Sequence, residues 1–171
     1  MKIIKILLFV YFNFLLLSTV QAFTDKEDKG AQSTGREDLS FLNAKNSNFK
    51  KGKDALKQAL KLHSKKKYIK ATKRFNDSLE YFLLAYEDYP DNVEILSYLA
   101  LTYNQVGDLF MAEIYYLEGL TIDPKNNSIN EKLGKLYFET KRIDFARERL
   151  KVLKFCNCKE YLNLKNIIIN Y

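Results

Sequence analysis

The feature that most limits the fold of this chain is a set of small residues that recurs at matched positions between about residues 52 and 158. The matched positions form three columns: Ala59, Ala100 and Gly134; Ala71, Ala112 and Ala146; and Ser78, Gly119 and Leu153, the last a large exception. The second and third copies are offset by 34 residues, and the first and second by 41. Because two antiparallel helices approach closely only where a small side chain faces a bulky one, the columns predict stacked helical hairpins.

Composition supports a single all-α domain. The 171 residues include only 6 Gly and 2 Pro, too few turn residues for a sandwich or barrel, while 47% are hydrophobic, enough for a core. We predict an antiparallel helix-pair solenoid over residues 49–171, with repeats at about 52–90, 93–126 and 127–158. The second helix of the first repeat, 68–89, is longer by almost two turns, which keeps its apolar face in phase. Residues 159–171 are predicted to form a helix that covers the end of the stack.

Helix ends are marked by a few residues. Gly107 suits a tight turn and Asp108 can cap the following helix. Ser128 with Glu131 has the spacing of a capping box. The spacing of Asp91 and Glu94 is a weaker version of the same signal. We therefore expect helices to start next to these pairs.

The second and third copies resemble the tetratricopeptide repeat family. The residues that carry the resemblance are Leu96, Leu99, Ala100, Tyr103, Gly107, Ala112, Tyr116, Gly119 and Pro124, and then Leu133, Gly134, Tyr137, Ala146 and Leu150. The chain departs from the family pattern at Leu96, where Trp is usual, and at Lys141 and Leu153, where small residues are usual. The resemblance covers about residues 52–158.

This resemblance implies that the first helix of each pair lines a concave groove that holds a partner segment. The candidate groove residues are Lys53, Lys57, Leu60, His63, Glu94, Ser97, Tyr98, Leu101, Asn104, Gln105, Glu131, Lys132, Lys135 and Phe138. Tyr98, Leu101 and Phe138 are the expected apolar anchors, although Tyr98 and Leu101 can equally pack against neighbouring helices. Glu94 and Leu101 disfavour capture of a peptide carboxyl terminus.

Residues 1–22 have the pattern of an export signal. A basic start and an apolar run from Ile6 to Leu17 precede Val20-Gln21-Ala22, so we predict cleavage near Ala22. An uncleaved membrane anchor is the alternative, but the run is short for a membrane span. Residues 23–48 are polar and are predicted to form a flexible linker. The frequent use of Lys, Asn, Ile and Tyr favours a bacterial chain and hence the periplasm, with a eukaryotic secretory route as the alternative.

Charge is segregated along the predicted domain. Residues 49–74 hold 11 basic residues and one acidic residue, 75–124 hold ten acids and no Lys or Arg, and 125–171 hold 11 basic and five acidic residues. The blocks either attract one another within the stack or face a charged partner. The partners left open are a protein segment, an anionic membrane surface for block 50–74, and a second copy of this chain. Nucleic acid is not expected, because no reading motif is present.

Catalytic patterns are sparse. The chain has one His and two Cys, so we predict no catalytic residues, no metal site and no cofactor. Cys156 and Cys158 are a candidate disulfide, since exported thiols tend to oxidise. Unpaired or intermolecular cysteines, and a thiol redox or copper-handling role, are the alternatives. The sequence therefore predicts a non-catalytic protein-interaction adaptor or scaffold in the cell envelope.

Overall fold

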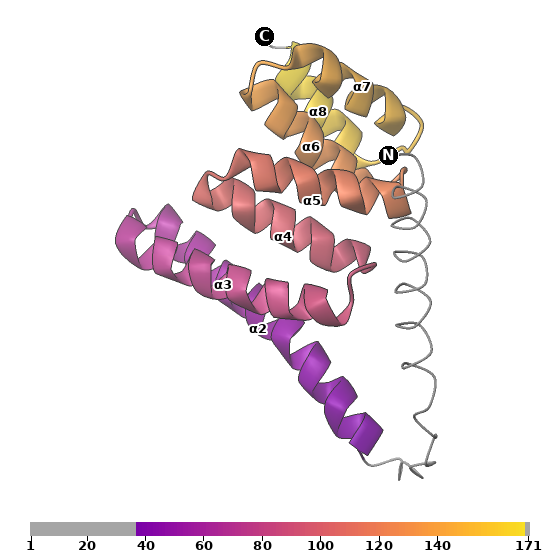
Figure 1. Ribbon diagram of the computed structural model, residues 1–171. Coiled ribbons are helices and arrows are strands. Elements are labelled where there is room, and N and C mark those ends of the chain that lie inside the picture. Colours follow the sequence, from indigo (N-terminus) through magenta and orange to yellow (C-terminus); the bar gives the residue numbers. More distant parts are fainter. Residues whose placement is uncertain (1–36, 170–171) are drawn as a thin grey trace, which may run out of the picture. The chain divides into compact units, whose positions relative to one another are not determined.

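The computed structural model describes residues 37–169, which form helices joined by short turns (Figure 1). The helices are α2 (Glu37–Ser64), α3 (Tyr68–Asp88), α4 (Val93–Val106), α5 (Leu109–Ile122), α6 (Asn127–Glu139), α7 (Ile143–Leu153) and α8 (Lys159–Ile169). Within this described part no residue is in a β-strand. The predicted all-α class is confirmed.

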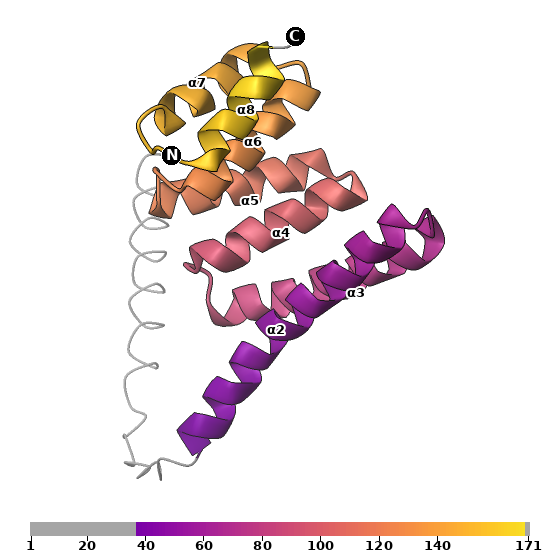
Figure 2. The ribbon, with the colours of Figure 1, turned by 180° about the vertical axis from the view of Figure 1, so that it is seen from behind.

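Consecutive helices pair into three antiparallel hairpins, α2–α3, α4–α5 and α6–α7, which stack one on the next (Figures 1 and 2). Helix α3 packs on α4, α5 packs on α6, and α8 packs on both α6 and α7. The terminal helix therefore covers the last hairpin, as a repeat stack requires.

The repeated small residues lie where the helices cross. The alanines of both columns, Ala59, Ala100, Ala71, Ala112 and Ala146, are at most 1% exposed. A Cβ atom on Gly134 would lie 2.5 Å from Leu164 of α8. The matched small residues thus mark close helix contacts, and the predicted helix-pair solenoid is confirmed.

A second close approach joins the helices of the first hairpin. A Cβ atom on Gly52 would lie 2.6 Å from the ring of Phe82, and the Ser78 hydroxyl donates a hydrogen bond of 2.9 Å to the carbonyl oxygen of Gly52. The bare glycine backbone lets α3 present both a ring and a hydroxyl directly to α2.

The turn between α4 and α5 forms as the sequence indicates. Gly107 has a φ of 89°, in the left-handed region that favours glycine. The carboxylate of Asp108 then accepts a hydrogen bond of 3.1 Å from the amide of Met111. This N-cap starts α5 immediately after the turn.

The capping-box predictions for α4 and α6 are wrong. The side chain of Asn92 caps α4 by accepting from the amides of Glu94 and Ile95, and Asn126 caps α6 by accepting from Ile129. Asn126 precedes Ser128, the predicted N-cap, by two residues. Helix α6 therefore begins about half a turn earlier than predicted. Asparagine is as good an N-cap as Ser or Asp, and two such residues compete at each of these turns.

The predicted linker 23–48 needs correction, because α2 begins at Glu37, inside the range predicted as linker. The ring of Phe49 lies 5.8 Å from that of Phe82 and 5.6 Å from that of Tyr98, centroid to centroid. Phe49 thus adds an apolar contact to α2 that precedes the repeated small residues. From Phe49 the helix continues back to Glu37. The remaining linker residues 23–36 and the predicted signal 1–22 lie outside the described residues.

Tyr116 provides a test of the core. Its side chain is 0% exposed, and among the described residues its hydroxyl has no hydrogen-bond partner. Burying an unpaired hydroxyl is unfavourable by about 1–3 kcal/mol, and the ring itself packs well. We expect Tyr116→Phe to raise the free energy of unfolding by about 1 kcal/mol in urea melts. A destabilised variant would show that the hydroxyl has a partner after all.

Candidate functional site

A hollow of about 520 Å³ lies between the first helices of the second and third hairpins. Its lining residues are Val93, Glu94, Ser97, Tyr98 and Leu101 from the α4 side and Asn126, Ser128 and Lys132 from the α6 side. We call it the α4–α6 groove. Helices α4 and α6 are in direct contact, so the groove is a surface depression over a packed base.

Tyr98 forms the apolar wall of the groove. Its ring stacks on Phe82 at a centroid distance of 5.4 Å and meets the edge of Phe49 at 5.6 Å. The side chain is half-buried, so one part packs on the first hairpin while the rest borders the groove. Leu101, almost one turn further along α4, is also half-buried against the core. The groove therefore has a rigid apolar side that needs no rearrangement to receive a ligand.

The opposite wall is cationic. The ammonium group of Lys132 donates a hydrogen bond to the Ser128 hydroxyl, and both side chains line the groove. Partial burial lowers the pKa of Lys132, an effect that the carboxylate of Glu131 opposes. On the α4 side, the Glu94 carboxylate lies 3.6 Å from the Lys53 ammonium in an exposed pair. The groove thus offers one partly desolvated cation opposite an apolar surface.

The structure brings together five of the predicted groove residues and separates the rest. Glu94, Ser97, Tyr98, Leu101 and Lys132 line the groove. The others lie elsewhere, and their places are as follows: Lys53, Lys57, Leu60 and His63 on α2; Asn104 and Gln105 near the end of α4; Glu131, Lys135 and Phe138 on α6 outside the lining.

Four of the separated residues already have packing or pairing roles. The Lys135 ammonium lies 2.6 Å from the Glu131 carboxylate, which also accepts a hydrogen bond from Asn163 of α8. Phe138 packs against the core. The His63 ring meets the edge of Tyr68 at 5.3 Å and so helps to close the α2–α3 turn. These residues do not line the α4–α6 groove, and their part in partner binding stays a prediction.

Sequence reasoning missed three lining residues, Val93, Asn126 and Ser128. All three lie at or beside the starts of α4 and α6. The sequence could have indicated these residues, because the N-cap positions of successive first helices face the same edge of a repeat stack. The capping-box predictions placed the N-caps of α4 and α6 at the wrong residues, so this edge was not recognised.

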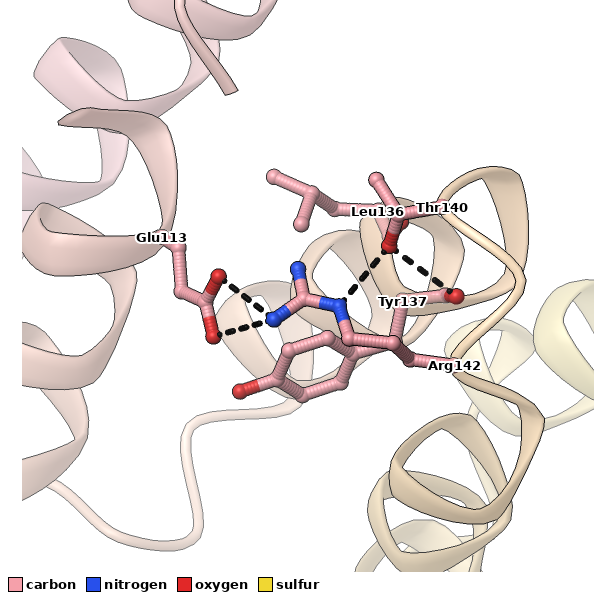
Figure 3. A network of polar contacts seen from close by, with 5 residues as sticks. All are labelled: Glu113, Leu136, Tyr137, Thr140 and Arg142. Atoms are coloured by element: carbon pink, nitrogen blue, oxygen red, sulfur yellow. Dashed lines mark hydrogen bonds and ion pairs between the residues drawn. The ribbon is translucent and has the colours of Figure 1, made fainter. Parts of the chain in front are cut away.

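A polar network fixes the third hairpin against the second (Figure 3). The Arg142 guanidinium lies 2.8 Å from the Glu113 carboxylate of α5, and its Nε donates to the Thr140 hydroxyl at 3.0 Å. The same guanidinium lies 4.6 Å from the centre of the Tyr137 ring. The network links α5 to the α6–α7 turn and so holds α6 in place beside α4.

Three buried or hydrogen-bonded tyrosines predict loss of stability at high pH. Burial and the Glu113 carboxylate raise the pKa of Tyr137 to about 12. A hydrogen bond to Glu118 raises the pKa of Tyr86 to about 12, and burial raises the pKa of Tyr116. A raised pKa favours the neutral phenol in the folded state, so this stabilisation is complete below about pH 10 and disappears as pH rises through about 12.

We therefore expect the urea midpoint to fall between about pH 10 and pH 12, together with the appearance of phenolate absorbance. The lowered pKa of Lys132 has the opposite effect on stability, because folding disfavours its charged form. This is a single group, whereas three tyrosines lower the stability as pH rises. A midpoint that stays constant over this range would contradict the burial of these hydroxyls.

Cys156 and Cys158 are joined by a disulfide in the turn between α7 and α8. Their Cα atoms are 5.2 Å apart, and Asn157 between them has a φ of 49°. Within residues 37–169, no group of three or more His, Cys, Asp or Glu side chains could hold a metal ion. The redox and copper-handling roles stay predictions.

None of the helices in the described part of the chain is both long enough and apolar enough to span a membrane. The predicted signal or anchor at 1–22 lies outside that part.

Comparison with known proteins identifies the architecture. No family model matches the sequence, and no curated protein matches it. Solved structures do match. The yeast Sti1 TPR2B domain in complex with pHsp70 has a TM-score of 0.54 at 11% identity, over 70% of this chain and 94% of that one.

Residues 37–169 have the tetratricopeptide-repeat fold. The Arabidopsis OM64 TPR domain has a TM-score of 0.53 at 14% identity, over 72% of this chain and 98% of that one. The first TPR of Spaghetti (RPAP3), bound to the HSP90 peptide SRMEEVD, has a TM-score of 0.51 at 15% identity, over 71% of this chain and 94% of that one. In the tetratricopeptide-repeat fold the α4–α6 groove lies between the first helices of two adjacent repeats.

Proposed function

We propose that this chain is a non-catalytic adaptor that binds a segment of another protein in the α4–α6 groove. The observation that carries the proposal is the groove itself, a preformed hollow of about 520 Å³ with an aromatic wall and a cationic wall. Two structures with the same fold are complexes, one with an HSP90 peptide and one with pHsp70. Ligand sites are typically concave and combine apolar surface with polar groups that fix the orientation of the ligand.

The walls of the groove define the chemistry of the partner segment. Tyr98 and Leu101 suit an apolar side chain, since aromatic groups dominate binding hot spots. Lys132, partly desolvated beside Ser128, suits a carboxylate or a backbone carbonyl of the same segment. We therefore propose an extended segment in which an apolar residue lies close to an acidic one.

The compartment proposed for this adaptor is the cell envelope, after cleavage near Ala22. The support is the pattern of residues 1–22, a basic start followed by a short apolar run and small residues. Mass spectrometry of the chain purified from its native cells is expected to give a mature amino terminus at Phe23. An intact Met1 would contradict export with cleavage.

The adaptor proposal is tested by filling the groove. Ser97 is half-buried on α4 and lines the groove, so Ser97→Arg places a long side chain between the two walls without changing the core. Leu117→Arg is the matched control, because Leu117 is 43% exposed on α5 and outside the groove lining. We expect proteins captured by the parent chain from native cells to be lost with Ser97→Arg and kept with Leu117→Arg.

The purified partner gives the quantitative result. Blocking a central binding pocket typically removes about 2–4 kcal/mol, so we expect affinity by calorimetry to fall by about 100-fold for Ser97→Arg. Equal affinity of both variants, with unchanged urea midpoints, would contradict binding in this groove. Capture of no protein by the parent chain would contradict the adaptor role.

A further inference from the structure

The turn between α2 and α3 carries an unusual concentration of positive charge. A hollow of about 490 Å³ at this turn is lined by Gln58, Lys61, Leu62, Lys65, Lys67, Lys70, Lys73 and Arg74. Six of these eight side chains are cationic, and all six are exposed. We call this set the basic turn.

The charge of the basic turn is almost unneutralised within residues 37–169. Arg74 pairs with Asp77 at 2.9 Å, whereas none of the five lysines has an acidic side chain within ion-pair distance in this part of the chain. Elsewhere the chain does pair its charges, as Glu113 with Arg142 and Glu131 with Lys135 show. Like charges held together without counter-charges favour binding of an external anion.

Helix α3 adds to this potential. The residue at its N-cap position, Lys67, makes no capping hydrogen bond through its side chain, and its first turn contains no acidic residue. The partial positive charge at the start of a helix is therefore not offset. It coincides with the lysine ammonium groups instead of opposing them.

Two large apolar side chains project from the same turn. Ile69 is 90% exposed and Tyr68 is 56% exposed, and they border a shallow depression with Lys66, Lys67 and Lys70. In both views the turn extends beyond the neighbouring α4–α5 turn, so it is the accessible tip of its hairpin (Figures 1 and 2). Exposed apolar residues ringed by lysines are the pattern of interfacial membrane contacts.

We propose that the basic turn docks this chain on an anionic lipid surface, with Ile69 and Tyr68 entering the interfacial region and the lysines contacting headgroup phosphates. The charge complementarity and the apolar tip act together, because lysines alone bind any polyanion while an exposed isoleucine needs an apolar phase. A second copy of the chain is a poorer occupant, since several of the acids in its 75–124 stretch are already engaged within the chain. Glu113 pairs with Arg142, Glu118 accepts from Tyr86, and Asp108 caps α5.

The proposal is independent of the α4–α6 groove and is tested with a fluorescent reporter. The sequence contains no Trp, so Ile69→Trp places a single indole at the tip. The full chain is mixed with phosphatidylcholine vesicles, with and without about a third of phosphatidylglycerol. We expect a blue shift of the indole emission only with the anionic vesicles, and its loss at high salt.

Matched variants locate the effect. Phe110→Trp is the position control, because Phe110 is 72% exposed on α5 in the stretch without Lys or Arg, and its emission should not shift. In the Ile69→Trp background, the triple change Lys65→Gln, Lys67→Gln, Lys70→Gln should weaken the lipid titration on the order of 100-fold. The triple change Lys125→Gln, Lys151→Gln, Lys154→Gln removes equal charge elsewhere and should weaken it far less. All comparisons use the same chain, so any contact by the apolar run 6–17 contributes equally.

Four results would overturn the proposal. The indole emission of the Ile69→Trp variant could stay unshifted on anionic vesicles, or shift equally on purely zwitterionic ones. The two triple variants could weaken the titration equally. A shift that appears without lipid as protein concentration rises, with a dimer in light scattering, would assign the basic turn to self-association instead.

Discussion

Replacing Phe82 with alanine is expected to lower the free energy of unfolding by about 4 kcal/mol. The ring is 0% exposed and lies where the first two hairpins meet, with Phe49 of α2 at 5.8 Å and Tyr98 of α4 at 5.4 Å. The ring packs directly on the backbone of Gly52 in α2, where an added Cβ atom would lie only 2.6 Å from it. Removing the ring therefore leaves a cavity at this junction. Urea unfolding followed by circular dichroism measures the loss.

The matched control is Phe110→Ala, which removes the same atoms from a side chain that is 72% exposed. We expect this change to cost less than about 0.5 kcal/mol. Similar losses for the two variants would show that Phe82 is not at a packed junction between hairpins. Because Tyr98 rests on Phe82, the Phe82→Ala variant should also bind the partner segment more weakly than its residual stability explains.

Leu164→Ala is expected to lower the free energy of unfolding by about 3 kcal/mol. Leu164 is 0% exposed on α8, and its methyl groups occupy the space that Gly134 leaves open on α6. The contact is the main closure of the last hairpin, whose apolar side would otherwise face water. The variant tests whether α8 stabilises the stack by covering its last hairpin or instead serves as a helix that binds a partner.

Leu162→Ala is the control on the same helix, since Leu162 is 56% exposed. It should leave the urea midpoint nearly unchanged, so that a large effect at position 164 reports packing and not helix propensity. If both variants were equally stable, α8 would not be the cap of this stack. Native-state hydrogen exchange would then show α8 opening independently of α6 and α7.

The stack was predictable because its constraint is local and repeated. Each helix crossing needs a small side chain, so Ala100, Ala112 and Gly134 indicate the fold wherever the three segments are aligned. The start of α2 was not predictable in this way. Residues 37–48 of that helix precede the repeated columns, so no matched small residue marks them.

The candidate site was predictable only in part. The side of α4 that faces the groove follows from helix periodicity, which places Ser97, Tyr98 and Leu101 correctly. Lys135 forms an ion pair with Glu131, four residues earlier on α6. This spacing was visible in the sequence, but both residues were predicted to face the groove. The basic block was visible as a run of lysines. The three-dimensional structure was needed to show that the five lysines of the basic turn have no ion pair within the described residues, and that an apolar tip lies beside them.

The most direct test of the α4–α6 groove is the alkylation rate of a cysteine placed inside it. Ser97→Cys changes one atom of a lining side chain, and Leu117→Cys provides an exposed reference on α5. The existing cysteines are joined to one another and do not compete for the reagent. With the captured partner bound, maleimide labelling should slow at position 97 and stay unchanged at position 117. Equal labelling rates at position 97 with and without the partner would contradict the central claim that this groove holds the partner segment.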